Sequence, residues 1–251
     1  MADFRGCGQC DELGSVYDLG EKEKTAQDLK ALYRCLFRFF GPQHWWPGDT
    51  PLEIAVGALL TQNTSWTNAS RAVEALKRRR LLSIPALERI PRKRLAALIR
   101  SSGYFNQKAA RIKGFIRYVR RHYSGRMSLM RRRETGALRR ELLSIFGIGP
   151  ETADSILLYA LNKPVFVVDA YTRRILARHS LIRLAASYEE IQSFLTAHLP
   201  ADTALYNDYH AQIVALGKGF CRPKNPLCEK CPARRIGRLR LEAGATLMPY
   251  S

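Results

Sequence analysis

Hydrophobic positions recur at helical spacing along most of the chain, and no segment alternates convincingly between apolar and polar residues. Helical patterns cover eight stretches, at residues 24–40, 67–79, 91–101, 106–122, 134–146, 150–161, 170–179 and 202–219. Most of them end at glycine, proline or a basic turn, as at Gly103, Gly125 and Pro200. The pattern therefore predicts an all-α protein of about ten helices on short connections.

Two of the expected helices are marked by their start signals. Thr50-Pro51-Leu52-Glu53 has the form of a capping box with proline at the first helical position, and Ser187-Tyr188-Glu189-Glu190 has the same form without the proline. Val165–Val168 (VFVV) is strand-like, but it is too short and too isolated to build a sheet.

The length of 251 residues suits one large domain or two small ones. The most apolar run, Pro51–Gln62, is too short to span a bilayer, so no membrane partner is expected. The first residues lack the basic-then-apolar pattern of a signal peptide, and we therefore expect a cytoplasmic, nucleoid-associated protein.

The charge is strongly basic and unevenly distributed. The chain has 41 Lys and Arg against 22 Asp and Glu, a net charge of +19. Residues 1–28 hold seven acids and three basic residues, which leaves a net charge of +23 on the rest. Solvated helix faces would explain scattered, balanced charges, whereas this chain is rich in arginine and unbalanced. A polyanionic partner, most commonly nucleic acid, fits better.

A glycine-rich turn, Gly147-Ile148-Gly149-Pro150, separates two helical patterns. Glycines allow a tight reversal and a close approach to the backbone, and the amides that begin the next helix suit a phosphate. A plain helix–helix turn is the alternative for such a short motif. The basic body of the protein favours a clamp for the DNA backbone.

Asp169 follows an apolar run and precedes the helical pattern of residues 170–179. Aspartate is a good helix N-cap, and that role alone would explain it. A rigid, partly desolvated carboxylate beside a DNA-binding turn could also stabilise an oxocarbenium-like sugar or activate a water.

Several motifs together resemble one family. The hairpin followed by VVDAYTRRIL (residues 167–176) is similar to the helix-hairpin-helix and glycine-proline-aspartate region of the endonuclease III superfamily of DNA glycosylases. LLTQNTSW (Leu59–Trp66), SGYFNQKAARI (Ser102–Ile112) and GIGPETADSILLYA (Gly147–Ala160) resemble its 3-methyladenine DNA glycosylase branch. The resemblance runs from about Trp45 to Cys231.

The resemblance implies a helical barrel at residues 51–162 that carries the hairpin. A second helical lobe would be formed by residues 23–50 and 163–240, with residues 1–22 as an acidic flexible tail. Asp169 falls on the catalytic aspartate of the superfamily. Glu151 occupies the position where glycosylase-lyases carry a Schiff-base lysine, and a carboxylate cannot form that imine. The expected enzyme removes a base without cutting the strand.

The three tryptophans lie within 22 residues of one another, in HWWPG and after TQNT. Core packing is the alternative reading for them. The resemblance implies that Trp45, Trp46, Pro47 and Trp66 sandwich the flipped base. Indole faces attract and stack on a purine made cationic by alkylation. Such a base leaves readily, so one carboxylate suffices.

A base reaches such a pocket only by leaving the stack, and other groups must fill the gap. The resemblance places Asn63 and Tyr104 at the wedge positions of the superfamily. A half-buried aromatic at a helix end is the alternative for Tyr104.

Three cysteines in the C-terminal part, Cys221, Cys228 and Cys231, have the spacing C-x6-C-x2-C. This spacing resembles the first three ligands of the superfamily's [4Fe–4S] loop, whose fourth cysteine would come where this chain has Gly237. Cys7 or Cys10 of the N-terminal CGQC could supply the fourth ligand. Alternatively, Cys7 and Cys10 together with Cys228 and Cys231 of CEKC could bind zinc. We favour a cluster, with an empty loop as the alternative; Cys35 is expected in the core.

The leading hypothesis is a monofunctional DNA N-glycosylase of base excision repair that removes alkylated purines, chiefly 3-methyladenine, from double-stranded DNA. A glycosylase of the same fold that acts on deaminated, damaged or mismatched bases is the second hypothesis. A non-catalytic helix-hairpin-helix DNA-binding protein is the third. A monomer is expected.

Overall fold

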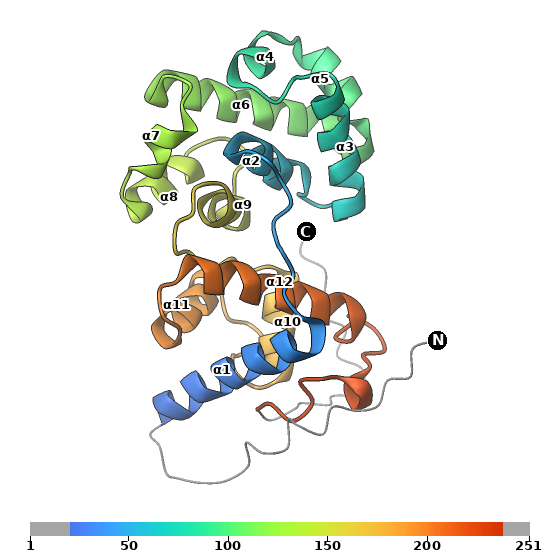
Figure 1. Cartoon of the computed structure of the whole chain (residues 1–251), viewed down its shortest axis with the longest axis vertical. Helices are drawn as coiled ribbons and strands as arrows, with labels where there is room; N and C mark the ends of the chain where they lie inside the picture. The colour runs from blue at the N-terminus through green and yellow to red at the C-terminus, as the bar shows by residue number, and fades with distance from the viewer. Residues whose placement is uncertain (1–20, 238–251) are drawn as a thin grey trace. The chain divides into compact units, whose positions relative to one another are not determined.

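The computed structural model describes residues 21–237, and this part of the chain is helical with no β-strand (Figure 1). This confirms the predicted fold class. The α-helices are α1 (Glu21–Phe40), α2 (Pro51–Leu60), α3 (Trp66–Arg78), α4 (Ile84–Arg89), α5 (Arg92–Leu98), α6 (Phe105–Tyr123), α7 (Met127–Arg131), α8 (Thr135–Leu143), α9 (Pro150–Ser155), α10 (Ala170–Arg178), α11 (Tyr188–His198) and α12 (Thr203–Gly219).

Some predicted elements differ in detail. The pattern at 91–101 is divided between α5 and a 3-10 turn, η2 (Arg100–Ser102), and the pattern at 150–161 continues from α9 into a π turn, η3 (Ile156–Ala160). The helices α4 and α7 were not predicted because six and five residues are too few to show a 3.6-residue period. The strand-like run at Val165–Val168 is buried and forms no strand.

The two expected capping boxes have different outcomes. The box at Ser187 is confirmed, because Ser187 and Glu190 each accept from the other's backbone N–H. At the start of α2, Thr50 Oγ1 accepts from Glu53 N at 3.1 Å, but the Glu53 carboxylate accepts from Asp49 N instead of Thr50 N. The second half of this box is thus replaced by a hydrogen bond from the backbone N–H one residue earlier, that of Asp49. Glu53 also forms an ion pair with Lys77 of α3 at 3.0 Å.

Contacts divide the chain into two units. One runs from Trp46 to Val165, and the other comprises the residues on both sides of it. The described residues do not include residues 1–20, which hold most of the predicted acidic segment (residues 1–22) together with Cys7 and Cys10. They also do not include the end beyond residue 237.

The central unit, Trp46–Val165, is built around α2. This helix contacts α3, α6, α9 and the η3 turn, and Figure 1 shows it between α6 and α9. Eight of the ten residues of α2 are buried, because this apolar helix has neighbours on every side. The core of this unit includes Val56, Leu59, Phe115 and Leu157, none of which has any exposed surface.

In the other unit, α12 packs against both α1 and α10. The Tyr209 hydroxyl of α12 donates to the Leu29 carbonyl of α1 at 2.8 Å, and Tyr33 of α1 donates to Asp208 at 3.1 Å. Because α1 precedes the central unit and α10 to α12 follow it, this unit can form only after both parts of the chain meet. Between residues 21 and 237, no helix has the length and apolar character needed to cross a membrane.

Candidate active site

Asp169 is the N-cap of α10 and has extended backbone angles. Its Oδ1 accepts two hydrogen bonds from Thr172, one from the backbone N at 2.7 Å and one from Oγ1 at 2.9 Å. The side chain is 13 % exposed. The carboxylate is thus fixed in direction by one oxygen, with the other oxygen, Oδ2, turned toward a second group.

That second group is His210 of α12, whose Nε2 lies 3.5 Å from Asp169 Oδ2. Burial acts to raise the pKa of Asp169, but the imidazole of His210 and the two Thr172 donors outweigh it, so this pKa lies below its ordinary value. The residue therefore carries a negative charge at neutral pH in spite of its burial. His210 is 4 % exposed and was missed by the sequence reasoning. Its signal was a lone histidine within an otherwise apolar helical face.

Close packing of α10 on α12 sets this geometry. A Cβ at Gly217 would lie 2.2 Å from the Tyr171 ring, so only glycine lets the two helices approach at this point. Arg174 donates to the carbonyls of Cys221 at 2.7 Å and Gly217 at 3.4 Å. These contacts fix the start of α10, and with it Asp169, against the helix that carries His210.

The hairpin at residues 147–149 lies in the central unit. Gly147 has a φ of +81°, which favours glycine, while Ile148 is 4 % exposed and anchors the turn in the core. A Cβ at Gly149 would meet no atom within 4 Å, so the backbone before α9 is open to a ligand on that side. Glu151 is exposed in the first turn of α9.

An ion pair joins the helices on either side of the hairpin. Arg139 of α8 donates to both oxygens of Asp154 of α9, at 2.7 and 3.0 Å, and the Asp154 side chain is fully buried. A bidentate pair of this kind fixes the angle between the two helices. The hairpin is therefore held at both ends.

The two expected wedge residues occupy two neighbouring turns of the central unit. Asn63 follows α2 with a φ of +50°, and Tyr104 precedes α6 with a φ of +44°. Both side chains are exposed, Tyr104 by 64 %. An aromatic this exposed is not a half-buried helix-end residue, which was the alternative for Tyr104.

The tryptophans do not form one stack. Trp46 meets Trp66 edge to face, with ring centroids 4.9 Å apart at 77°, and packs on Tyr159 at 5.0 Å. Rings at this angle do not offer two parallel faces to one base. Trp45 belongs to the other unit, where the Lys218 ammonium lies 5.8 Å from its ring centroid. Pro47 is exposed at the start of the central unit.

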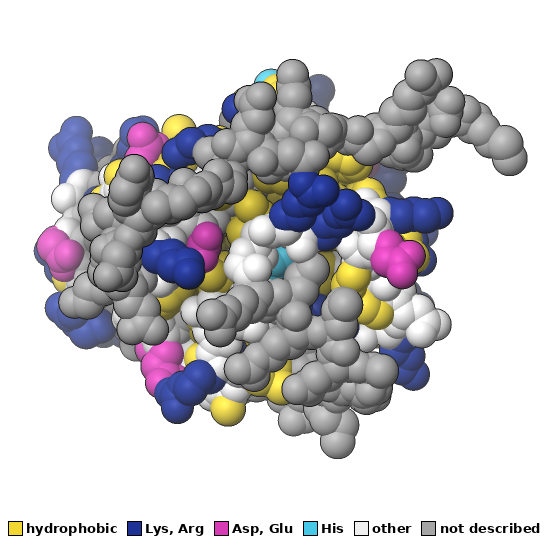
Figure 2. All heavy atoms as spheres, turned by 90° about the horizontal axis from the view of Figure 1, so that it is seen from below, with side chains coloured by type: hydrophobic (Ala, Val, Ile, Leu, Met, Phe, Trp, Pro, Cys, Tyr) yellow, Lys and Arg dark blue, Asp and Glu magenta, His cyan; other side chains and the backbone are white. Residues whose placement is uncertain are grey.

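Basic side chains extend over the surface. On the face shown in Figure 2, Lys and Arg lie around much of the margin, and Asp and Glu occur singly among them. A spread of positive charge of this kind attracts a polyanion from many directions.

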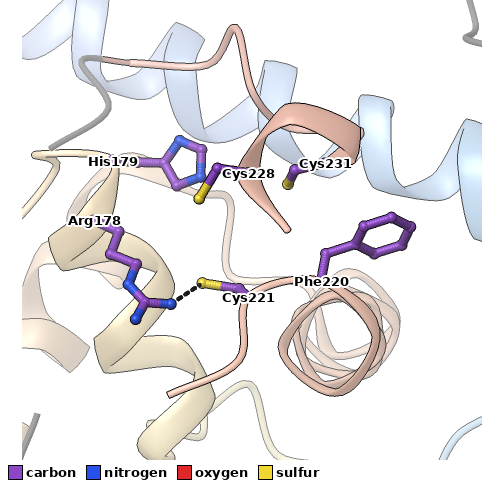
Figure 3. Close-up of a pocket in the computed structure, with 6 residues that line it drawn as sticks. All are labelled: Arg178, His179, Phe220, Cys221, Cys228 and Cys231. Atoms are coloured by element: carbon purple, nitrogen blue, oxygen red, sulfur yellow. Dashed lines mark hydrogen bonds between the residues drawn. The ribbon is translucent and has the colours of Figure 1, made fainter. Parts of the chain in front are cut away.

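The three cysteines of the C-terminal loop line one small pocket with Arg178, His179 and Phe220 (Figure 3). Arg178 donates to Cys221 Sγ at 3.2 Å and to the carbonyls of Arg222 and Pro223 at 2.7 and 3.1 Å. Burial raises the pKa of Cys231 to about 11, and the pKa of Cys228 is raised by the same cause. The Cys228 and Cys231 thiols are therefore protonated at neutral pH without a metal.

A four-thiolate cluster does not fit the residues described. Gly237, at the place of the fourth cysteine, has a φ of +65°, and a Cβ there would lie 2.5 Å from the His179 carbonyl oxygen. Within residues 21–237 no three His, Cys, Asp or Glu side chains converge to hold a metal ion. A [4Fe–4S] cluster normally needs four thiolates, so no step of the chemistry is assigned to one. Cys35 is buried, as expected.

Similarity to known proteins identifies the family of this chain. Residues 56–200 match the model of the HhH-GPD superfamily of base excision DNA repair proteins. The chain belongs to this superfamily. A Methanocaldococcus jannaschii protein that carries the provisional name DNA repair glycosylase is 43 % identical over 216 residues, which cover 86 % of this chain and 98 % of that protein. Endonuclease III of Thermotoga maritima is 31 % identical over 184 residues, 72 % of this chain and 79 % of the relative.

Solved structures of the HhH-GPD superfamily have the same fold. The Helicobacter pylori 3-methyladenine DNA glycosylase, bound to 1,N6-ethenoadenine, is similar with a TM-score of 0.65 and 29 % identity over 77 % of this chain and 97 % of that one. A non-covalent complex of endonuclease III with DNA gives a TM-score of 0.73 at 20 % identity over 85 % of this chain and 95 % of that one. By its family, this HhH-GPD protein is a DNA glycosylase of base excision repair.

Proposed function

We propose that this HhH-GPD protein is a monofunctional glycosylase that releases alkylated purines of the 3-methyladenine type from double-stranded DNA. The observation that carries this proposal is the buried Asp169 carboxylate, whose pKa is held low, in a chain with Glu151 at the lyase position. The Helicobacter pylori enzyme, similar over most of this chain, supports the substrate class.

Asp169 supplies negative charge where the reaction needs it. The bond between C1′ and the base nitrogen breaks, and its electron pair leaves with the base, which neutralises the positive charge of an alkylated purine. The sugar becomes oxocarbenium-like, and a fixed carboxylate stabilises this charge. Water then bonds to C1′ and loses a proton, which leaves an abasic site.

The hairpin, the wedge residues and the tryptophans would prepare the base. Amides at the start of α9 suit a backbone phosphate, and Asn63 and Tyr104 would fill the gap in the stack. For Trp46 and Trp66 to stack on both faces of one base, one indole must rotate from the 77° arrangement. A stack on one indole, with the other at its edge, needs no such change.

Glu151 supports the monofunctional assignment. A lyase of this superfamily forms an imine between a lysine amine and the sugar carbon, and a carboxylate has no equivalent reaction. Base release should therefore proceed without strand cleavage. Lys108 is buried and Lys163 donates to the Arg133 carbonyl at 2.6 Å, so neither is presented to a ligand as a free amine in this structure.

The deciding experiment offers the protein methylated DNA and duplexes with uracil, hypoxanthine or thymine glycol, and counts free base and nicked strands separately. We expect release of 3-methyladenine without nicks and no borohydride-trapped adduct. Release from the other duplexes alone would favour the second candidate, a glycosylase for deaminated or oxidised bases. Efficient trapping would contradict the monofunctional assignment, and DNA binding without any release would leave a binding module.

A further inference from the structure

Helix α6 carries a lysine in its first turns that the proposed chemistry does not use. Lys108 has no exposed surface, and its Nζ donates to two carbonyl oxygens, that of Leu60 at 2.9 Å and that of Ser102 at 2.5 Å. Burial lowers the pKa of Lys108 to about 8. Burying an ammonium costs stability unless its donors are used, and this one donates to the last residue of α2 and the last residue of η2.

Both carbonyls lie just ahead of the proposed wedge residues. Leu60 ends α2, three residues before Asn63, and Ser102 lies two residues before Tyr104. Asn63 and Tyr104 both have positive φ, a region in which residues with side chains are strained. Such conformations persist only where the surroundings hold them, and Lys108 is a shared support for both turns.

A second side chain of α6 extends this support to the hairpin. Arg111 donates to the Gln62 side-chain oxygen, and Gln62 Nε2 donates to the Gly147 carbonyl at 3.0 Å and to Thr152 Oγ1 at 2.9 Å. Arg111 also packs across Gly147, where a Cβ would lie 2.6 Å from its Nε. One helix thus connects the turn after α2, the turn before α6 and the hairpin.

We propose that Lys108 is a positioning residue for base extrusion, which holds the turns of Asn63 and Tyr104 at a fixed spacing so that both side chains enter the duplex together. This inference rests on the proposed function, which assigns these two residues to the gap left by the base. A lysine that only caps the C-terminal end of α2 would instead stabilise the fold without any effect on extrusion.

Lys113 provides a matched control on the same helix. Its Nζ also donates to two carbonyls, those of Leu87 at 2.8 Å and Glu88 at 2.7 Å. These belong to α4, and neither wedge turn is involved. Lys113→Met therefore removes the same kind of bonds as Lys108→Met while both wedge turns keep their support.

The test separates extrusion from catalysis. A duplex with 2-aminopurine at the target position reports extrusion, because its fluorescence rises when the base leaves the stack. We expect Lys108→Met to bind this duplex with nearly unchanged affinity and to lose most of the rise, while Lys113→Met keeps it. Lys108→Gln, whose amide can still donate to one carbonyl, should give an intermediate signal and serves if the methionine variant does not fold.

Base release gives the second readout. In single turnovers on a well-paired methylated duplex, Lys108→Met should release the base roughly ten- to a hundredfold more slowly than the wild type. A small misplacement of a reacting group has about this effect on a rate. On a lesion in a bulge, already unstacked, most of that loss should disappear. Equal losses on both substrates, or equal signals from the Lys108 and Lys113 variants, would overturn the proposal. So would a wild-type protein that gives no rise, whereas a rise without base release from any lesion would refute only the proposed function.

Discussion

At the scale of single residues, the proposed chemistry depends on how the Asp169 carboxylate is surrounded. Asp169 would be a sufficient N-cap on an exposed helix, yet here Thr172 occupies one oxygen and His210 lies 3.5 Å from the other. The result is a charge that is both buried and maintained. Fixed charges in a partly desolvated place stabilise a developing cation more than mobile charges in water.

Asp169→Asn keeps the size and the N-cap of this residue but removes its charge. We expect base release to fall by about a thousandfold or more, since the stabilising charge is lost from the transition state. Affinity for duplex DNA should hardly change, because many phosphate contacts remain. Single-turnover release and a binding titration check this, and retained turnover would remove Asp169 from the mechanism.

His210→Asn removes the imidazole and keeps a polar group. The pKa of Asp169 should rise, because burial still acts to raise it and the largest opposing contribution is gone. In the proposed mechanism only the ionised carboxylate is active, so the acid limb of the rate–pH profile should move to higher pH. In the wild type, ionised Asp169 stabilises the fold at pH values above its ordinary pKa, and this stabilisation is lost as the pH falls through the lowered pKa. In the variant we expect that loss at a higher pH.

A matched control for this change is His198→Asn on α11, where the ring contacts the Phe194 carbonyl and not Asp169. That variant should keep the wild-type pH profile. An unchanged acid limb in His210→Asn would mean that Thr172 alone keeps the carboxylate ionised.

Trp66→Ala tests the aromatic pocket. If this indole stacks on a cationic purine, its loss should cost about 1–3 kcal/mol, and the loss should be larger for 3-methyladenine than for neutral hypoxanthine. Trp66 also packs against the core, so the rates must be compared at a temperature where both proteins are folded. Equal fractional losses on the two lesions would contradict a base contact.

At the scale of elements, the hairpin depends on the two helices that flank it. The Ile148 side chain anchors the turn in the core, and the Arg139–Asp154 pair fixes α8 against α9. Amides at the start of a helix are useful to a phosphate only when the helix is held in place. The elements thus determine the direction in which a short sequence motif presents its backbone.

Asp154→Ala leaves Arg139 without its bidentate partner. We expect a loss of about 3 kcal/mol in the free energy of unfolding, because a partly buried guanidinium loses its counter-charge. Urea unfolding measures this. Arg183→Ala, which breaks the exposed pair with Glu190 on α11, should cost less than about 1 kcal/mol. Similar losses in the two variants would contradict the assigned role of the buried pair.

At the scale of the whole molecule, the two units have different origins in the chain. Residues 46–165 are continuous and fold around α2, while the other unit combines α1 with α10 to α12. Charge is also a property of the whole chain, since a net +19 favours a polyanion before any specific contact forms.

The cysteine loop gives the prediction at this scale. Within residues 21–237 there are three thiols in one pocket, so a [4Fe–4S] cluster would need a ligand from the N-terminal CGQC. We therefore expect the double variant Cys7→Ser/Cys10→Ser, purified anaerobically, to contain neither iron nor sulfide and to be colourless. A brown double variant with full iron content would contradict this, and stoichiometric zinc in the wild type would indicate the zinc alternative.

Much of the fold follows from local chemistry that the sequence carries by itself. Apolar spacing and start signals such as Ser187 and Glu190 act within one helix, so they predict helices without knowledge of their neighbours. The hairpin glycines and the N-cap Asp169 are local in the same sense. The family motifs indicated which of these local elements would carry the proposed chemistry.

The tertiary structure decided the features that join residues far apart in the chain. The approach of His210 to Asp169 depends on Gly217 and Tyr171, and the support of Asn63 and Tyr104 by Lys108 spans 48 residues between its α2 carbonyl and α6. No periodicity records such contacts, because they arise when separate helices pack. The short α4 and α7 and the 77° angle between Trp46 and Trp66 likewise depend on packing. The sequence by itself determined the helices and the candidate chemistry, and packing determined which side chains act on one another.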